Sequence, residues 1–424
     1  MLSIDYITNS KDDAIIGLKK RGFKNIDVLD SIIELNDNRK KIQQELDNIL
    51  FKSNTISKEI AEAFKSGNND IDIDSLKSES SNLKLQSKSL AEELDTVKIK
   101  ISDLITKVPN IPDSKVPDGL SEENNIEVFR SSNFKESGYN LKNHWDLSKE
   151  YDIIDFELGS KITGSGFPVY KGKGAKLQRA LINFFLDRNN SAGYNEFQVP
   201  HLVNSDSAYA TGQLPDKDGQ MYHVINDDFY LIPTAEVPLT NIYRDKILAV
   251  DQVPVMMTGY TPCFRREAGS YGSDVRGLNR LHQFDKVEIV RIEHPDKSDD
   301  ALIKMKEHIK EILTELKIDF RILNLCAGDL GFTSSITYDF EVFSKGQEKW
   351  LEISSVSNFK TYQSNRLNLK FKDKDGKNYT LHTLNGSSLA LPRVMAGLIE
   401  NNQSENGIII PDVLVPYTGF DTIN

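Results

Sequence analysis

The sequence predicts an α+β fold: an N-terminal antiparallel coiled-coil arm, then a domain built on a large antiparallel β-sheet flanked by helices. Three observations predict it. Apolar residues repeat in heptads through two early stretches, prolines cluster directly after the second stretch, and many short apolar runs then follow with few helical stretches between them. We place the domain boundary at the prolines, which gives domains at 1–110 and 111–424.

The two early stretches carry heptad seams that are apolar apart from a few polar positions. Seam positions lie three or four residues apart from Ile32 to Ala63, and again from Leu76 to Val108. The turn-forming segment KSGNNDIDID between them predicts that two helices fold back on each other. Heptads alone are also typical of an oligomerisation rod, but such a rod has one long seam. A hairpin buries its own seam and leaves its outer faces free for a partner.

The composition restricts the class of protein. The 424 residues carry a formal net charge of −11, and 38% of them are hydrophobic, which is typical of a globular protein. No apolar run reaches the roughly 18 residues that span a membrane, and the polar start MLSIDYITNSKDD does not resemble a secretory signal. Cys263 and Cys326 form neither a zinc motif nor a disulfide framework. We therefore expect a cytoplasmic protein without zinc or membrane contact.

The second domain shows helical spacing in three places and strand-like runs elsewhere. Helices are predicted at 174–190, at 300–317 and from Pro392 onward. Strands are predicted at 194–203, 227–237, 253–264, 281–292, 320–327, 336–343, 349–357 and 379–388. The sequence contains neither GxGxxG nor GxxxxGK[ST], so a nucleotide would need a scaffold other than a Rossmann or P-loop fold.

Chemically active residues are densest at 258–290, TGYTPCFRREAGSYGSDVRGLNRLHQFDKVEIV. The segment predicts two antiparallel strands joined by a glycine-rich, charged loop. Side-chain alternation would place Arg265 and Glu267 on one face, together with Phe284 and Glu288 of the facing strand. Such a face offers a guanidinium for phosphate, a carboxylate for an amino group and an aromatic ring for a base. An isolated FRRE is more often a surface hairpin, but the loop spacing and the following HQF favour a functional site.

The segments TPCFRREAGS and RGLNRLHQFDKVE resemble motif 2 of the class II aminoacyl-tRNA synthetases, in the form found in bacterial-type seryl-tRNA synthetases. LIPTAEVPLTN resembles the serine-binding strand of that family. GAKLQRALINFFLD followed by GYNEFQVPHLV resembles motif 1, and Pro200 stands at the position of the proline in that motif. LEISSVSN and HTLNGSSLALPRVMAGLIENNQ resemble the metal-binding strand and motif 3. The coiled-coil arm and the VPDGLSEENNIEV linker fit the same family. The resemblance therefore covers essentially the whole chain.

The resemblance implies a serine site. The matching positions are Thr234, Glu236, Arg265, Glu288 and Ser387. The two glutamates would receive the ammonium group and the hydroxyl, and the sequence leaves open which glutamate takes which. A site that hydrogen-bonds the hydroxyl rejects alanine by a factor of about 10⁴ or more, because its own polar groups would otherwise stay buried and unpaired. Threonine would be rejected for lack of space.

The resemblance also implies a site for ATP with Mg²⁺. Arg265 would hold the α-phosphate together with the serine carboxylate, and Glu267 would accept a hydrogen bond from the adenine amino group. Phe284 would stack on one face of adenine, and Arg393 would cover the other face and reach the γ-phosphate. The matching metal ligands are Glu352 and Ser355, whose oxygens suit a hard cation. Further matching ATP positions are Arg266, Ile353 and Ser354.

The implied activation step needs no general base, because the carboxylate of serine is already ionised. It would attack the α-phosphorus, pyrophosphate would leave, and a terminal hydroxyl of tRNA would then attack the carbonyl of seryl-adenylate. Catalysis would rest on positioning and charge neutralisation, chiefly by Arg265 and Arg393 as catalytic residues. We interpret His282 and His382 as structural.

The implied partners are tRNA(Ser), bound by the arm, and a second copy of the chain, with Pro200 at the dimer interface. Whether tRNA(Sec) is also charged stays open. Residues 25–108 hold 12 basic against 16 acidic side chains, so the RNA would have to follow a local basic stripe. Candidate contacts are Lys40, Lys41, Lys84 and Lys88.

Three other functions agree less well with the sequence. A ligase that loads a carrier protein would lack the arm. A non-catalytic RNA-binding dimer would have lost Arg265, Glu267, Glu352 or Arg393, and all four are present. A class II enzyme for threonine or proline is disfavoured by TAEVPLTN and HTLNGSS. The chain departs from the family pattern in YQSNR, in GSSLA and in the residue before Arg393, and these departures concern the fine geometry of motif 3.

Overall fold

The computed structural model describes residues 1–66, 72–131, 138–267 and 276–424. The chain divides into two compact units, one of residues 1–19 and 23–109 and the other of residues 20–22 and 110–424. The centre of the expected inter-helix turn and most of the expected glycine-rich loop lie outside the described residues. In the described part of the chain, no helix is long and apolar enough to cross a bilayer.

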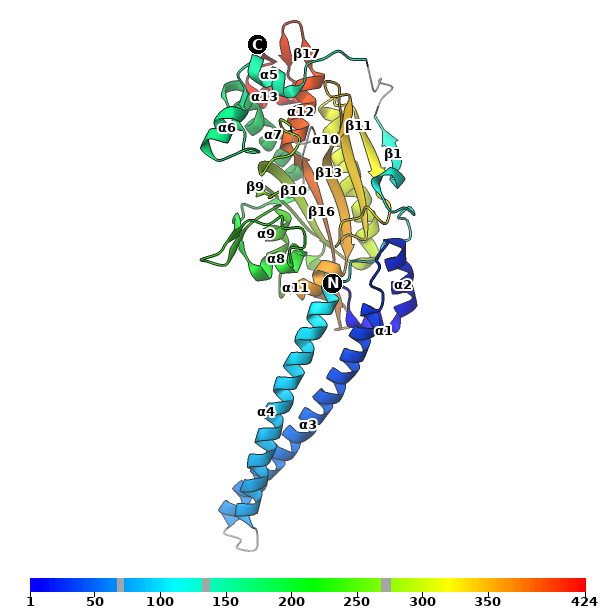
Figure 1. The fold of residues 1–424 in the computed structure, drawn as a ribbon, viewed down its shortest axis with the longest axis vertical. Helices are drawn as coiled ribbons and strands as arrows, with labels where there is room; N and C mark the ends of the chain where they lie inside the picture. The colour runs from blue at the N-terminus through cyan, green and yellow to red at the C-terminus, as the bar shows by residue number, and fades with distance from the viewer. Residues whose placement is uncertain (67–71, 132–137, 268–275) are drawn as a thin grey trace. The chain divides into compact units, whose positions relative to one another are not determined.

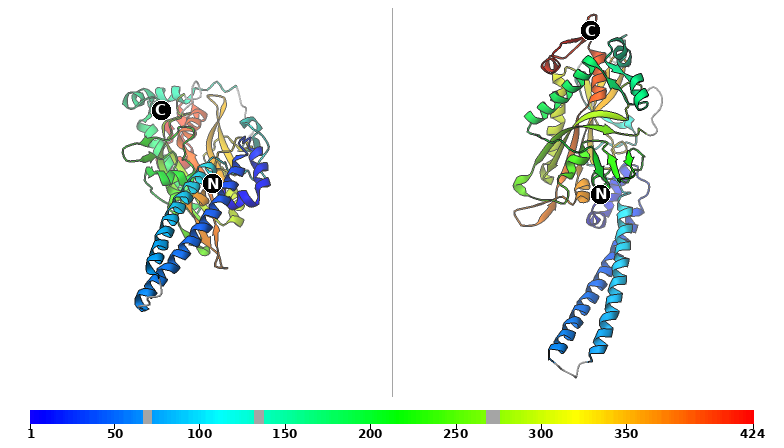
Figure 2. Two further views of the ribbon diagram at one scale, coloured as in Figure 1. Left: turned by 60° about the horizontal axis from the view of Figure 1, so that its bottom comes forward. Right: turned by 90° about the vertical axis from the view of Figure 1, so that its left-hand side faces the viewer.

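The first unit is helical, with α1 (Ile4–Asn9), α2 (Lys11–Lys20), α3 (Val28–Ser66) and α4 (Ile73–Ile105). Helices α3 and α4 run alongside each other as an antiparallel hairpin (Figures 1 and 2). Apolar side chains of the two predicted seams pack together between them, namely Ile42, Leu46, Leu94, Val97 and Ile101. The side chain of Asp72 caps α4 by accepting a hydrogen bond from the amide of Ser75 at 3.0 Å. The predicted hairpin is thereby confirmed.

The second unit is built on an eight-stranded sheet with the order β1-β11-β12-β13-β16-β10-β9-β4. Every pair is antiparallel except β4 with β9. The strands are β1 (Ile126–Arg130), β4 (Asn195–Glu196), β9 (Val255–Phe264), β10 (Gln283–Glu293), β11 (Phe320–Asn324), β12 (Ile336–Ser344), β13 (Lys349–Lys360) and β16 (His382–Ala390). The predicted α+β class with a large antiparallel sheet is confirmed.

Three helices pack against this sheet and close the main hydrophobic core: α7 (Gly172–Ser191), α10 (Ser298–Glu315) and α12 (Leu391–Asn401) (Figure 1). Alternation along the central strand β10 divides its side chains between two surfaces. Val287 and Ile289 point into the core. Phe284, Lys286 and Glu288 instead line cavities at the opposite face of the sheet. The sheet therefore presents a polar face that the three helices leave open.

Shorter elements surround that face. The helices are α5 (His144–Glu150), α6 (Phe156–Ile162), α8 (Ser205–Thr211), α9 (Glu236–Asn241), α11 (Tyr362–Leu367) and α13 (Val415–Thr418). The strands are β2 (Ile154–Asp155), β3 (Val169–Tyr170), β5 (Leu202–Asn204), β6 (His223–Val224), β7 (Phe229–Leu231), β8 (Ile247–Ala249), β14 (Lys370–Lys372), β15 (Asn378–Thr380), β17 (Gln403–Ser404), β18 (Gly407–Ile409) and β19 (Thr422–Ile423).

Three local expectations were wrong. The run 227–237 is a strand only at β7, and the expected serine-binding strand continues as helix α9. The run 194–203 holds two short strands, β4 and β5, rather than one. Strand β9 ends at Phe264, so Arg265 and Glu267 do not alternate along it. Glu267 has φ 48°, a left-handed conformation, and the loop rather than the strand pleat sets its direction.

Candidate active site

Two adjoining cavities open on the polar face of the sheet. Their volumes are about 490 and 930 Å³, and both are lined by Glu236, Arg265, Glu352 and Ser387. The first is also lined by six other predicted site residues: Thr234, Glu267, Phe284, Ile353, Ser354 and Arg393. The second adds Glu288 and Ser355. Segments far apart in the sequence thus bring the predicted substrate-binding residues together, with Arg266 as the exception.

A buried polar cluster forms one wall. The ammonium group of Lys286 lies 2.5 Å from a carboxylate oxygen of Glu288 and donates to the hydroxyl of Thr234 at 2.8 Å. That hydroxyl lies 3.2 Å from the same carboxylate and also accepts from the amide of Glu236. Lys286 and Glu288 lie two residues apart on β10, so the pleat directs both to the same face. Lys286 partly neutralises the carboxylate that burial would otherwise penalise.

Glu236, in the first turn of α9, is a buried acid of this wall. Burial and, after it, the nearby carboxylate of Glu288 raise its pKa to about 7, against the opposing effects of Gln363, Lys286 and Arg265. The amide of Gln363 donates to Glu236 at 2.6 Å, and its oxygen accepts from the hydroxyl of Thr383. The wall therefore holds one more carboxylate than its cations neutralise, which suits a small cationic ligand.

Arg265, Phe284 and Glu267 form the next part of the cavity. Pairing of β9 with β10 sets Cys263 opposite Phe284, and the amide of Arg265 continues the contact by donating to the carbonyl of His282 at 2.9 Å. The guanidinium of Arg265 lies 5.3 Å from the centre of the Phe284 ring. Glu267 accepts from Arg280 at 3.0 Å. A cation, an aromatic plane and a carboxylate thus line one cavity.

Arg393 borders the same cavity from the first turn of α12, where Pro392 suits the helix start. Its Nε donates to the carbonyl of Asn279 at 2.9 Å. One terminal nitrogen donates to the carbonyl of Glu352 at 2.8 Å and lies 3.5 Å from the carboxylate of that residue. Backbone acceptors on two different segments thus fix the direction of the guanidinium.

An acidic group lies beside Arg393. The hydroxyl of Ser355 donates to the buried carboxyl of Asp339. Burial raises the pKa of Asp339 well above its usual range, and the negative charge of Glu352 adds to that effect. Within the described residues, no group of three or more His, Cys, Asp or Glu side chains is arranged to hold a metal ion.

The remaining predicted positions lie elsewhere. The guanidinium of Arg266 lies 5.5 Å from the Tyr222 ring and does not line the first cavity. Pro200 is exposed between β4 and β5. His282 is hydrogen-bonded to Tyr222 at 2.9 Å, and His382 to the Ser298 hydroxyl at 2.7 Å.

Comparison with known proteins identifies the family. Residues 1–112 match the model of the seryl-tRNA synthetase N-terminal domain, and residues 222–402 match that of the tRNA synthetase class II core domain (G, H, P, S and T). A serine–tRNA ligase of Salinibacter ruber is 44% identical over all of this chain and 99% of its own length. The chain belongs to the seryl-tRNA synthetases. The serine–tRNA ligase of Thermodesulfovibrio yellowstonii is 42% identical over the full length of both chains.

Solved seryl-tRNA synthetases share the fold along the whole chain. The enzyme of Pyrococcus horikoshii, solved with ATP, has a TM-score of 0.90 and 32% identity, covering 100% of this chain and 99% of its own. The cytoplasmic enzyme of Naegleria fowleri, solved with AMP, has a TM-score of 0.85 and 26% identity, with the same coverage. A prolyl-tRNA synthetase of Giardia lamblia, at 0.57 and 12% over 66% of this chain and 58% of its own, shares the fold alone.

Sequence reasoning missed three residues of this candidate site. Lys286 and Gln363 contact the predicted serine-binding side chains, and Asp339 contacts a predicted metal ligand. Lys286 could have been found, because it lies two residues before Glu288 on a predicted strand and so shares its face. Gln363 and Asp339 come from other segments, and no local pattern joins them to the site.

Proposed function

We propose that the chain activates L-serine with ATP to form seryl-adenylate and diphosphate, and then transfers the seryl group to tRNA(Ser) with release of AMP. The observation that carries the proposal is the buried wall of Thr234, Glu236, Lys286 and Glu288, which adjoins Arg265 and Phe284 in one cavity. An ammonium group, a hydroxyl and a nucleotide each find chemical partners there, within the fold of the seryl-tRNA synthetases.

The wall accounts for serine selection. The ammonium group of serine would supply the positive charge that Glu236 and Glu288 still lack after pairing with Lys286. The hydroxyl would bond to the same polar groups, with Thr234 and Ser387 nearby. Alanine would leave those buried groups unpaired, which costs about 1–3 kcal/mol for each group.

The activation step follows from the placement of charge. Arg265 would hold the serine carboxylate and the α-phosphate, while Phe284 stacks on adenine and Glu267 accepts from its amino group. One carboxylate oxygen of serine would form the new bond to the α-phosphorus as the bond to the bridging oxygen of diphosphate breaks. Arg393 would offset the charge that develops on the departing phosphates. The contribution of these side chains is positioning and electrostatic stabilisation.

The acidic group fits a magnesium ion. Glu352 and Ser355 would hold it, with Asp339 adjacent to Ser355, because carboxylate and hydroxyl oxygens are the ligands that a hard cation prefers. Mg²⁺ usually takes one or two protein carboxylates and completes its shell with phosphate and water, which agrees with the small number of protein ligands here. When bound, the ion would neutralise phosphate charge.

The arm is the proposed tRNA-binding element, and the working form is a cytoplasmic homodimer with Pro200 at the interface. Lys40, Lys41, Lys84 and Lys88 are all exposed on the hairpin, as a backbone-reading stripe requires. The matched relatives carry the name serine–tRNA ligase or seryl-tRNA synthetase over their full length, which supports tRNA charging by this chain.

The test is amino-acid-dependent ATP–pyrophosphate exchange with serine, threonine, alanine, glycine and cysteine, followed by charging of bulk tRNA. We expect exchange with serine alone and formation of seryl-tRNA. Exchange without tRNA charging would point instead to a ligase that loads a carrier protein. Absence of exchange with every amino acid would leave only a non-catalytic RNA-binding protein.

A further inference from the structure

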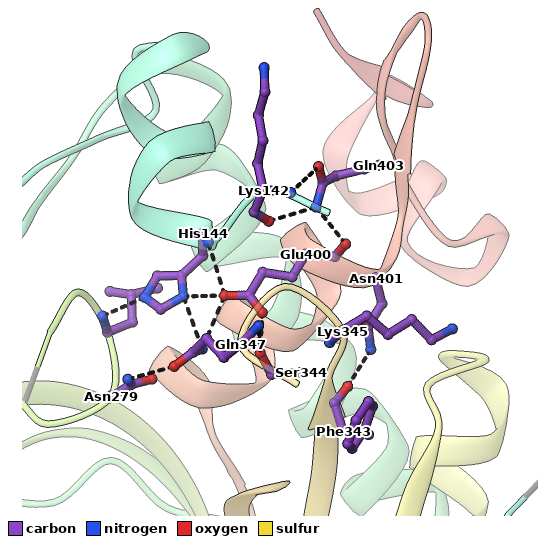
Figure 3. A network of polar contacts seen from close by, with 11 residues as sticks. Lys142, His144, Asn279, Phe343, Ser344, Lys345, Gln347, Glu400, Asn401 and Gln403 are labelled. Atoms are coloured by element: carbon purple, nitrogen blue, oxygen red, sulfur yellow. Dashed lines mark hydrogen bonds and ion pairs between the residues drawn. The ribbon is translucent and has the colours of Figure 1, made fainter. Parts of the chain in front are cut away.

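A buried polar network joins α5, α12 and the β12–β13 turn to the residues just before β10 (Figure 3). At its centre are His144, in the first turn of α5, and Glu400, near the end of α12. Both side chains are fully buried. Neither lines the two cavities of the site, and the proposed reaction does not use them.

The hydrogen bonds define the proton position on His144. Its Nε2 accepts from the amide of Leu278 at 2.8 Å, which requires a free lone pair on that nitrogen. The proton of the neutral ring therefore sits on Nδ1, which lies 2.6 Å from Glu400 Oε1 and donates to it. The ring thus links one carboxylate to one backbone amide and has a different role at each nitrogen.

Four donors hold Glu400. Oε1 accepts from the amide of His144 at 2.9 Å, from its Nδ1, and from the side-chain amide of Gln347 at 3.0 Å. Oε2 accepts from the hydroxyl of Ser344. Burial opposes the charge, but the bonds from His144 and Ser344 outweigh it and lower the pKa of Glu400. An ionised carboxylate with four donors fixes the orientation of every group around it.

The network reaches the site through the segment between Arg276 and Arg280. Gln347 accepts from the side chain of Asn279 at 2.8 Å, while the carbonyl of that same residue receives Nε of Arg393 at 2.9 Å. Trp145, next to His144, lies under the guanidinium of Arg276 at 4.5 Å from the ring centre. The segment is therefore held at the amide of Leu278, at the carbonyl and side chain of Asn279, and at the side chain of Arg276.

The packing leaves little room for adjustment. A Cβ added to Gly277, whose φ is 66°, would lie 2.2 Å from His144 Nε2. A Cβ on Gly346 would lie 2.6 Å from the carbonyl of Lys142 and 3.1 Å from the Glu400 carboxylate. Both sides of the His144–Glu400 pair are thus closely covered by backbone, so a change at the pair has to move the segment that it holds.

We propose that His144 and Glu400 are positioning residues that set the direction of Arg393 through the carbonyl of Asn279, and so tune the binding of ATP rather than of serine. The inference rests on the proposed function, in which Arg393 contacts the nucleotide. The serine wall shares no hydrogen bond with this network among the described residues. A substitution at His144 should therefore affect the binding of ATP more than the binding of serine.

The test uses the full-length chain in ATP–pyrophosphate exchange, with KM and kcat measured separately for ATP and serine. The variant His144→Phe keeps an aromatic ring and loses both bonds, whereas His144→Gln keeps one donor and one acceptor. We expect His144→Phe to lower kcat/KM for ATP by about 10- to 100-fold with the serine KM almost unchanged, since small misplacements of a positioned group cost that much. His144→Gln should recover most of the loss.

The matched control is His382→Phe, which replaces a partly buried histidine whose ring is hydrogen-bonded to the Ser298 hydroxyl, away from this network. Equal losses in the two Phe variants, parallel changes in both KM values, or unchanged ATP kinetics in His144→Phe would each overturn the inference. If His144→Phe does not fold, Gln347→Leu takes its place, because it cuts the bond to Asn279; unchanged ATP kinetics there overturn the inference too. Absence of exchange by the unaltered chain would overturn the proposed function and this inference together.

Discussion

At the scale of single residues, Glu236 should make serine recognition depend on pH. Its pKa of about 7 in the folded chain lies well above the ordinary value of roughly 4.3 for a glutamate. Below about pH 7 the carboxyl is therefore protonated, and the ammonium group of serine meets one charge fewer. With a single proton involved, kcat/KM for serine should fall about tenfold for each pH unit below about 7.

The measurement is pyrophosphate exchange across this pH range at saturating ATP. The variant Glu236→Gln should give a low, flat profile, and it should stabilise the free protein at alkaline pH. The sign follows because a carboxyl whose pKa is raised by folding contributes stability at low pH and loses it as the pH rises through the folded pKa. A wild-type profile with no inflection near pH 7 would contradict this role.

Arg265 and Arg266 form a matched pair for a second test. Arg265 lines both cavities, while its neighbour lies against Tyr222. A lysine cannot reproduce a planar, two-pronged contact with phosphate and carboxylate. We expect Arg265→Lys to lower kcat for exchange by about 100-fold or more, in line with the loss of one preorganised charge-stabilising donor, and Arg266→Lys to have a smaller effect. Equal losses of kcat in the two variants would mean that Arg265 contributes no more to activation than Arg266 does.

Sequence motifs predicted twelve of the residues that line the two cavities, but not the contacts that set their charge. Glu236 and Glu288 could be identified because each lies in a continuous segment of sequence that resembles a family motif. Gln363 reaches Glu236 from 127 positions away in the sequence. Such a contact depends on where α11 lies against the sheet, and no local spacing reports that position.

At the scale of elements, the periodicity of apolar residues predicted the helices that bury one apolar face. The seams of α3 and α4, and the apolar stripes of α7 and α10, appear as helices close to the expected bounds. Helix α9 was missed, because its residues follow an apolar strand and include Pro238. A six-residue helix is too short for a 3.6-residue period to be visible, and its position at the site comes from packing under β10.

The seam of the arm offers a third test. Leu94 is 4% exposed and packs in the cluster between α3 and α4, whereas Ile99 on the same helix is 63% exposed. Leu94→Ala should destabilise the hairpin by about 2–5 kcal/mol, because it leaves a cavity that the rigid seam cannot close. Ile99→Ala should change stability by no more than about 0.5 kcal/mol.

Urea unfolding followed by far-ultraviolet circular dichroism would compare the two arm variants, with pyrophosphate exchange as a second readout. Exchange should stay at the wild-type level in both, because every proposed contact with serine and ATP lies in the second unit. Similar stability of the two variants would show that the seam does not hold the arm together.

At the scale of the whole molecule, the division of the chain into two compact units predicts that two chemical steps can be separated. In the proposed reaction, activation needs serine, ATP with its magnesium ion, and the cavities of the second unit. Transfer also needs tRNA, for which the first unit offers an exposed helical hairpin with a local set of lysines. Damage to the arm should therefore remove transfer and leave activation intact.

The most direct test of this prediction removes whole heptads from the arm, so that the remaining seam positions of α3 and α4 stay in register. Deleting residues 50–63 from α3 and 76–89 from α4 shortens both helices by two heptads each and takes away Lys84 and Lys88. We expect serine-dependent exchange at the wild-type rate and loss of tRNA charging. The matched control replaces only these two lysines by glutamine, which should weaken charging and reduce its dependence on salt, since each phosphate contact releases counterions. Normal charging by the shortened chain would mean that the outer half of the arm does not contact tRNA, and loss of exchange would mean that the two units depend on each other for folding.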